Sequence, residues 1–293
     1  MPGQLPGRGE VFLDHVAHFV PALDPAAEAL TACGFRLTPY AAQQNRLDGG
    51  TVPAGTANRC AMLRRGYVEI IAATSDTPLA RQLAERLRHH VGLHLAAFSS
   101  ADAAAEHRRL AAAGFAVEPL IDMRRPAAVA ADGLEARFTI ARIAPGQMPE
   151  GRIQFLTHRT PDLVWPPPYL EHPNGAEALA ALWIAADDIA EAAARVACFT
   201  GRPASTQGDM TPIVLDRGVL RFAAPALLER EFGIAPGPQP PYLAAYEILV
   251  AGLDPLRRAL DAVGLAARPI AGGLAVGLPP ALGGTILFRT QHG

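Results

Sequence analysis

The 293-residue chain contains no lysine. All 26 of its Lys-or-Arg positions are arginine, and it has 28 acidic residues. Schiff-base and pyridoxal-phosphate chemistry needs a lysine amine, so the sequence excludes those enzyme classes. The phosphate-binding loop of nucleotide hydrolases needs a Gly-Lys pair and is excluded as well. A net charge of −2, with no basic cluster longer than two residues, also argues against a nucleic-acid partner.

Long hydrophobic runs and paired cysteines are also missing. No stretch of 18 uncharged apolar residues offers a membrane span, and the opening MPGQLPGRGE lacks the basic-then-apolar pattern of a signal peptide. The three cysteines, Cys33, Cys60 and Cys198, include no CxxC pair, which is typical of reduced thiols. We therefore expect a cytoplasmic protein with no membrane partner. Because half of its residues are hydrophobic, the chain can bury a sizeable core.

What the sequence does contain is an internal repeat. Four segments, starting at Leu13, Gly92, Leu182 and Tyr246, share one layout: an apolar strand, an Asp, an Ala-rich helix and a Gly near the helix end. The Asp is a good helix N-cap, and the Gly suits a left-handed C-cap. After each helix comes β-type sequence, such as YVEIIAA in the first segment and RIQFLTH in the second. The repeat predicts an α+β fold of four βαβββ modules.

Proline marks the boundary between the two pairs of modules. The stretch TPDLVWPPPYLEHPN contains three consecutive prolines, which cannot continue a helix or a central strand. We therefore predict an N-terminal domain over 11–165, a proline-rich linker over 166–176 and a C-terminal domain over 177–290.

Paired modules that open with LDHVA and close with a strand such as YVEIIA resemble the vicinal oxygen chelate superfamily. This superfamily includes glyoxalase I, methylmalonyl-CoA epimerase, extradiol dioxygenases and fosfomycin or bleomycin resistance proteins. The stretches GTANRCAML and THRTPDLVW are similar to its glyoxalase-like domain branch. The resemblance implies that each pair of modules forms a half-barrel, which gives two glyoxalase-like domains, and that a half-barrel can hold a divalent metal.

The resemblance also implies a ligand set, with one residue from the first and one from the last strand of each module. In the first module these residues are His15 and Glu69, and in the second they are His94 and Gln154. Two imidazoles, a carboxylate and an amide oxygen suit Mn, Fe, Co, Ni or Zn. Gln154 stands where many members of the superfamily have a second carboxylate, which lowers the charge of the site by one.

Neighbouring side chains are candidates for substrate binding. Asn58 and Arg59 lie in the strand expected beside Glu69, and His158 ends the strand of Gln154. We expect these three residues to contact substrate, with Arg59 as an alternative partner for Glu69, a carboxylate that needs one if it is buried among apolar residues.

The second half lacks these ligands. RGYVEIIAA aligns without gaps to RGVLRFAAP, which pairs Glu69 with Arg221, and the strand of His15 aligns with a strand that has Ala245 in its place. We therefore expect the C-terminal domain to keep the fold and to lack the metal.

Three functions are compatible with this site. The first is a metal-dependent lyase or isomerase that stabilises an enolate or enediolate of a small molecule with adjacent oxygens, with Glu69 as the base. The second is an Fe(II) dioxygenase that uses His15, His94 and Glu69. The third is a non-catalytic protein that binds a small molecule, as the resistance proteins do. A small molecule is the expected partner, and the chain can be a monomer or a homodimer.

Overall fold

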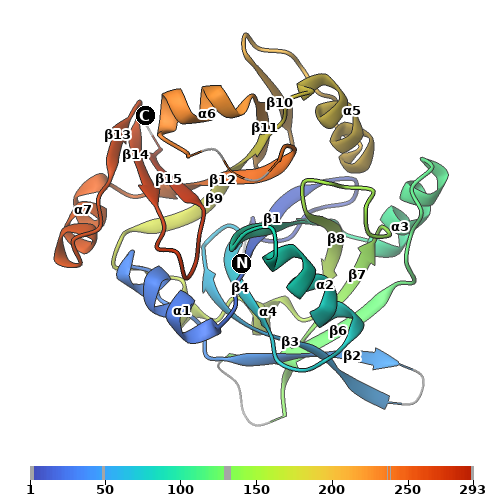
Figure 1. The fold of residues 1–293 in the computed structure, drawn as a ribbon. Coiled ribbons are helices and arrows are strands. Elements are labelled where there is room, and N and C mark those ends of the chain that lie inside the picture. The colour runs from blue at the N-terminus through green and yellow to red at the C-terminus, as the bar shows by residue number, and fades with distance from the viewer. Residues whose placement is uncertain (1–2, 48–49, 129–132, 236, 238, 292–293) are drawn as a thin grey trace.

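The computed structural model describes residues 3–47, 50–128, 133–235, 237 and 239–291. The chain forms two halves, a closed eight-stranded barrel followed by an open seven-stranded sheet (Figure 1). The barrel half contains β1 (Phe12–Phe19), α1 (Leu23–Ala32), β2 (Ala41–Leu47), β3 (Gly50–Met62), β4 (Tyr67–Ala73), α2 (Pro78–Leu87), β5 (Gly92–Ser99), α3 (Ala103–Ala112), β6 (Ile121–Pro126), β7 (Glu135–Arg142) and β8 (Arg152–His158).

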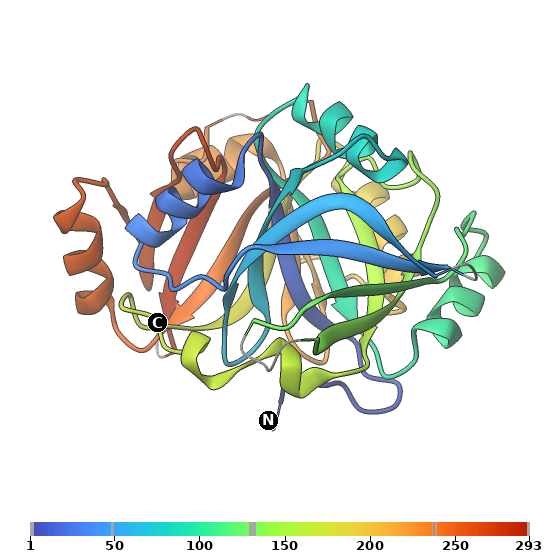
Figure 2. The ribbon, with the colours of Figure 1, turned by 90° about the horizontal axis from the view of Figure 1, so that it is seen from below.

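The strands of the barrel follow the order β1-β4-β3-β2-β6-β7-β8-β5. The first strands of the two modules, β1 and β5, pair antiparallel, and each pairs in parallel with the last strand of its own module, β4 or β8. Helix α2 lies at one end of the barrel and the short α4 (Pro161–Val164) lies at the other (Figure 2). Leu83 of α2 and Val164 of α4 both pack into the cluster of apolar side chains inside the barrel.

The second half is built from the remaining elements. They are η1 (Pro167–Tyr169), β9 (Ala176–Ala185), α5 (Ile189–Thr200), β10 (Met210–Val214), β11 (Val219–Ala223), α6 (Pro225–Phe232), β12 (Tyr242–Val250), α7 (Leu253–Ala262), β13 (Arg268–Ile270), β14 (Gly273–Gly277) and β15 (Thr285–Thr290). The strand order of this sheet is β10-β11-β9-β12-β15-β14-β13, so β9 and β12 are neighbours at its middle and correspond to the neighbouring strands β1 and β5 of the barrel.

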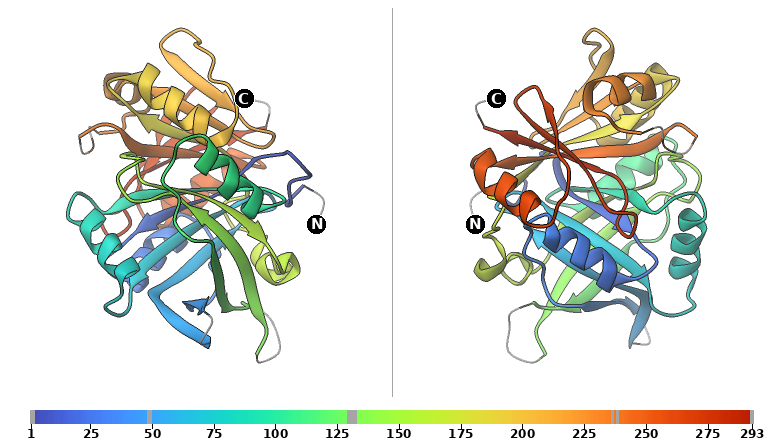
Figure 3. Two further views of the ribbon diagram at one scale, coloured as in Figure 1. Left: turned by 90° about the vertical axis from the view of Figure 1, so that its right-hand side faces the viewer. Right: turned by 60° about the vertical axis from the view of Figure 1, so that its left-hand side comes forward.

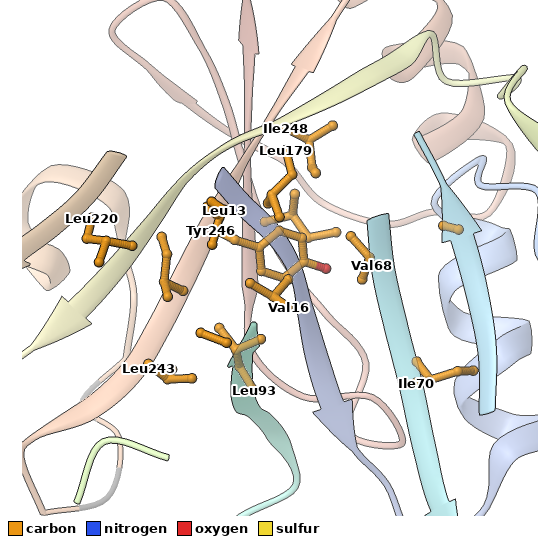
Figure 4. Close-up of a cluster of buried hydrophobic side chains, with 14 of the residues drawn as sticks. Leu13, Val16, Val68, Ile70, Leu93, Leu179, Leu220, Leu243, Tyr246 and Ile248 are labelled. Carbon is orange, nitrogen blue, oxygen red and sulfur yellow. The ribbon is translucent and has the colours of Figure 1, made fainter. Parts of the chain in front are cut away.

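The two halves stack on one another (Figure 3). One face of the second sheet packs against the outer face of β1, β4 and β5, and buried side chains fill the space between them (Figure 4). Val16 and Val68 from the barrel meet Leu179, Tyr246 and Ile248 from the second sheet in this layer. The other face of the second sheet packs against α6, which contributes Leu228 to a separate apolar cluster. The second sheet therefore has one buried face and one face that is only partly covered.

The prediction of an α+β fold with four modules is confirmed, with one difference in the third. After α5 this module has only the two strands β10 and β11, because residues 202–209 form isolated bridges rather than a third strand. The second sheet accordingly stays open, whereas the complete first and second modules close into a barrel.

The capping prediction was right for two helices and wrong for two. Asp102 caps α3 and Asp188 caps α5 through side-chain bonds to backbone N–H groups. In α1 and α7 the corresponding Asp24 and Asp254 lie inside the first turn, and the N-cap residues bond nothing through their side chains. The helix α6 was not predicted.

The proline-rich segment between the halves packs closely on the barrel. His172 in this segment is buried; its Nε2 donates to the Met62 carbonyl oxygen at 2.8 Å, and its Nδ1 accepts from the Arg36 N–H at 3.0 Å. Among the described residues, no helix is both long and apolar enough to cross a bilayer.

Candidate functional site

The candidate site lies inside the barrel, on the inward face of β1 and the strands beside it. Because strand side chains alternate between faces, His15 shares the interior with Ala17 and Phe19, while Val16 and Val20 point to the outer layer. The interior pocket beside His15 is small, with a free volume of about 30 Å³.

A β-bulge sets the position of His15. Leu13 pairs with Phe98 and His15 pairs with Ala97, which leaves Asp14 as an extra residue on β1. The bulge lets Asp14 bond the imidazole next to it in the chain, an arrangement that strict alternation does not allow. His15 Nδ1 donates to Asp14 Oδ1 at 2.8 Å, and His158 Nε2 donates to Asp14 Oδ2, also at 2.8 Å.

Asp14 is fully buried between these two imidazoles. Burial by itself would raise the pKa of Asp14, but the charge of His158 and the hydrogen bonds from His15 and His158 hold that pKa well below its usual range. The carboxylate fixes His15 as the tautomer with its proton on Nδ1, which turns Nε2 toward the pocket. The His15 ring also stacks on Tyr67, with ring centroids 4.2 Å apart.

Glu69, on the neighbouring strand β4, faces this free nitrogen. Its Oε2 lies 3.5 Å from His15 Nε2, and its Oε1 accepts hydrogen bonds from Asn58 Nδ2 and, at 3.2 Å, from Gln43 Nε2. Thr56 Oγ1 in turn donates to Gln43 Oε1 at 2.6 Å. One oxygen of Glu69 is therefore held by amides, while the other is directed at His15.

Two arginines stand between this inner pocket and the surface. Arg142 Nε donates to Gln154 Oε1 at 2.8 Å, and Arg142 and Arg152 both line the inner pocket. The same two residues line an outer groove of about 510 Å³ between α2 and the loop that joins β7 to β8. Burial lowers the pKa of Arg142 to about 10 and that of Arg152 to about 9, so both side chains are charged at neutral pH.

His94 does not join the other predicted ligands. It is the extra residue of a second bulge, on β5, because Leu95 pairs with Ala17 and Leu93 pairs with His18. Its Nε2 donates to the His90 carbonyl oxygen at 2.8 Å. Burial lowers the pKa of His94 to about 3, so the ring is neutral.

The counterpart of His15 in the second module is Leu95. His15 pairs with Ala97, and Leu95 pairs with Ala17, so the two residues occupy equivalent places about the axis that relates β1 to β5. The matching of His15 to His94 in the sequence was one residue out of register, and in a strand one residue reverses the face.

Of the three predicted substrate-binding residues, two lie at the site and one does not. Asn58 faces the pocket but bonds Glu69, and His158 is buried against Asp14. Arg59 points to the other face of β3, where its Nε donates to the Thr38 carbonyl oxygen, so it is not the partner of Glu69. Sequence reasoning missed Asp14, Gln43, Arg142 and Arg152. The only signal for Asp14 was its position directly before His15.

The donors do not fit the predicted four-ligand metal centre. His15 Nε2 and Glu69 Oε2 are oriented to share an ion, but Gln154 is engaged by Arg142, and Leu95 stands where a second imidazole is needed. Three guanidinium groups also line the same pocket, those of Arg125, Arg142 and Arg152. In the described ranges no group of three or more His, Cys, Asp or Glu side chains has the arrangement of a metal site.

The fold and site define a class of protein, in which βαβββ modules pair in the manner of the vicinal oxygen chelate superfamily and place a polar site inside a barrel. A sequence profile described as a glyoxalase-like domain matches residues 13–200. The chain therefore belongs to the glyoxalase-like domain family. No curated protein matches its sequence significantly.

Solved structures share the fold at low sequence identity. A hypothetical protein from Staphylococcus aureus is 11% identical with a TM-score of 0.62, covering 96% of this chain and 99% of that one. The Mn(II)-bound glyoxalase from Novosphingobium aromaticivorans is 13% identical with a TM-score of 0.54, covering 96% and 83%. The 2,3-dioxygenase LapB from Pseudomonas sp. KL28 is 14% identical with a TM-score of 0.54, covering 97% and 93%. At these identities the likeness concerns the fold alone.

Proposed function

We propose that the chain is a lyase or isomerase that moves a proton on a small carboxylate-bearing molecule with adjacent oxygens. The observation that carries this proposal is the ordered row of buried groups from His158 through Asp14 and His15 to Glu69. Burying a carboxylate between imidazoles costs folding free energy unless every charge is paired, and such rows are typical of proton-transfer sites.

Glu69 is the base in this proposal. Asn58 and Gln43 hold one carboxylate oxygen in place, so the other has a fixed direction for accepting a proton from a carbon atom next to a carbonyl. The proton can then pass to His15 Nε2 or return to the substrate. Asp14, which accepts the hydrogen bond from His15 Nδ1–H, stabilises the imidazolium that forms when Nε2 is protonated.

Arg142 and Arg152 bind the anionic end of the substrate and stabilise the enolate oxygen. Both guanidinium groups lie between the outer groove and the inner pocket, where exclusion of water strengthens their effect on a developing negative charge. A free volume of about 30 Å³ admits roughly one water-sized group, so only the reacting end of the substrate enters the inner pocket. The rest of the substrate occupies the outer groove.

No step of the proposed proton transfer passes through a metal, because the donors around His15 and Glu69 do not complete a ligand set. The dioxygenase alternative needs a second imidazole beside His15, and both nearby candidates are engaged elsewhere, His94 with His90 and His158 with Asp14.

The test is exchange of carbon-bound hydrogen for deuterium in D₂O, followed by proton NMR on a panel of small 2-oxo and 2-hydroxy acids. We expect at least one of these acids to exchange with the wild-type chain, and we expect Glu69→Gln to lower the rate by about 10²- to 10⁴-fold. Glu171→Gln, at an exposed position paired with Arg64, is the matched control and keeps the full rate. Equal exchange rates in wild type and Glu69→Gln would contradict the proposal.

A further inference from the structure

The face of the second sheet that points away from the barrel carries a groove of about 920 Å³. Its floor is formed by side chains from the four central strands, Trp183 on β9, Arg221 on β11, Glu247 on β12 and Arg289 on β15, and α6 forms one wall. This groove lies in the half of the chain that the proposed proton transfer does not use.

The floor of the groove is the counterpart of the barrel site. In the barrel, the parallel pairing of β1 and β4 sets Ala17 opposite Glu69. In the second sheet, the parallel pairing of β9 and β11 sets Trp183 opposite Arg221. Arg221 thus occupies the place of Glu69, as the sequence alignment predicted, so a cation stands where the first half has its base.

The charges on the floor are incompletely paired. Glu247, only 6% exposed, accepts a hydrogen bond from Trp183 Nε1 at 2.8 Å. Its Oε1 lies 3.6 Å from Arg289 Nε and 3.9 Å from Arg221 Nε, distances of ion pairs rather than hydrogen bonds. Within the described part of the chain, the buried Arg221 Nε has no hydrogen-bond partner. Two guanidinium groups around one carboxylate leave a net charge of +1.

Part of the groove wall is apolar and aromatic, and the rest is polar, with Gln207, Asp209, Arg230 and Glu231 among its side chains. Phe232 of α6 packs edge-on against Trp183 with ring centroids 4.8 Å apart, and Met210, Leu227 and Leu249 also line the groove. Arg221 lies over the Trp183 ring, 5.6 Å from its centroid. A cationic floor beside an aromatic wall suits a ligand with one anionic end and a flat apolar body.

We propose that this groove is a second binding site, separate from the barrel site, for a small aromatic monocarboxylate. The carboxylate accepts hydrogen bonds from Arg221 and Arg289, which satisfies the unpaired Arg221 Nε, and the ring packs against Phe232 and its apolar neighbours. A monoanion matches the net charge of +1 better than a dianion such as phosphate does. The only carboxylate on the floor, Glu247, is engaged, so this site binds its ligand without transforming it.

The test uses Trp183 as the reporter and benzoate as the probe. The chain has two tryptophans, so Trp165→Phe leaves Trp183 as the sole source of indole fluorescence. We expect benzoate to change this fluorescence saturably and Arg221→Gln to weaken the binding by at least about tenfold, since a charge-assisted hydrogen bond is lost. Arg289→Gln should weaken it as well. Where Trp165→Phe lowers stability, calorimetric titration of the otherwise unaltered chain gives the same comparison.

The controls separate this site from the barrel and from general anion binding. Arg257→Gln, an exposed change on α7, and Glu69→Gln, in the barrel, should leave benzoate affinity unchanged. Benzyl alcohol, which lacks the charge, should bind at least about tenfold more weakly. The proposal is overturned if no binding occurs up to about 10 mM benzoate, if Arg221→Gln binds as well as the parent, or if inorganic phosphate displaces benzoate at equal concentration.

Discussion

The Nε2 atom of His15 lies 3.5 Å from Oε2 of Glu69 in the barrel interior. If Glu69 is the base and His15 receives its proton, loss of either residue should lower the hydrogen-exchange rate by a different factor. We expect His15→Ala to lower the hydrogen-exchange rate by about 10- to 100-fold, less than Glu69→Gln, because Glu69 can still return its proton to the substrate. Exchange by proton NMR measures both variants. A larger loss in His15→Ala than in Glu69→Gln would reverse the two roles.

Asp14 links this pair to His158, and its replacement tests whether the buried carboxylate orients His15. In Asp14→Asn an amide nitrogen, which is a donor, replaces one carboxylate oxygen, so the side chain can no longer accept hydrogen bonds from both imidazoles. We expect the free energy of unfolding to fall by about 2–4 kcal/mol and the exchange rate to fall with it. Urea denaturation followed by circular dichroism measures the stability. Asp162→Asn, at an exposed position in α4, is the matched control and should have almost no effect.

Metal removal tests the mismatch between the donors and a metal centre. We expect chelation with EDTA to leave hydrogen exchange unchanged, because only His15 and Glu69 are oriented to share an ion. Leu95→His would introduce an imidazole in register with His15, and we expect this variant to bind Zn²⁺ or Mn²⁺ more tightly than the wild type by at least about tenfold. Calorimetric titration measures both affinities. Stoichiometric metal in the wild type that is lost in His15→Ala would show that the native donors suffice.

His18 gives the chain a pH-dependent contact between its halves. Its Nδ1 lies 3.2 Å from the Leu282 carbonyl oxygen and its Nε2 lies 3.1 Å from the Tyr246 hydroxyl, and burial lowers the pKa of His18 to about 4. Because the folded state favours the neutral ring, this contribution is complete above the unfolded pKa of 6.5 and is lost as the pH falls toward 4.

We therefore expect the free energy of unfolding to decrease between pH 7 and pH 4.5, with His18 contributing about 2–3 kcal/mol of the decrease. His18→Gln removes the titrating group and should flatten the pH profile by that amount, even if it lowers stability at pH 7. Parallel pH profiles for the two proteins, measured by urea denaturation, would refute the assignment.

Gly66 supports the site from the turn before β4. Its φ is +78°, and an added Cβ would lie 2.7 Å from the Asp14 backbone oxygen. We expect Gly66→Ala to lower the free energy of unfolding by about 2 kcal/mol or more, since strain at positive φ adds to the clash. Gly114→Ala is the matched control, because Gly114 has a φ of +91° but open space around it, and it should lose only about 1 kcal/mol. Equal thermal shifts in the two variants would show that the clash is relieved without cost.

Much of the fold follows from local patterns in the sequence. Apolar strands, Ala-rich helices and glycines at helix ends recur four times, and each pattern depends on residues close together in the chain. Glu69 likewise shares its face with Tyr67 and Ile71, because alternation is a local property of a strand that the sequence order alone sets. The missing strand of the third module was not predictable in this way, since strand formation there depends on pairing with distant residues.

The site was predictable only in part, for a related reason. The sequence by itself determined that no lysine takes part and that Arg221 aligns with Glu69 in the second half, and the family resemblance placed His15 and Glu69 in one site. The tertiary structure alone decided the bulges at Asp14 and His94, because a bulge depends on how two strands separated by some 80 residues pair. At each bulge the register shifts by one residue, and this shift directs Asp14 to His15 and turns His94 away from the site. The barrel of this structure therefore brings Asp14, His15 and Glu69 together, and it does not gather the four ligands that the resemblance implied.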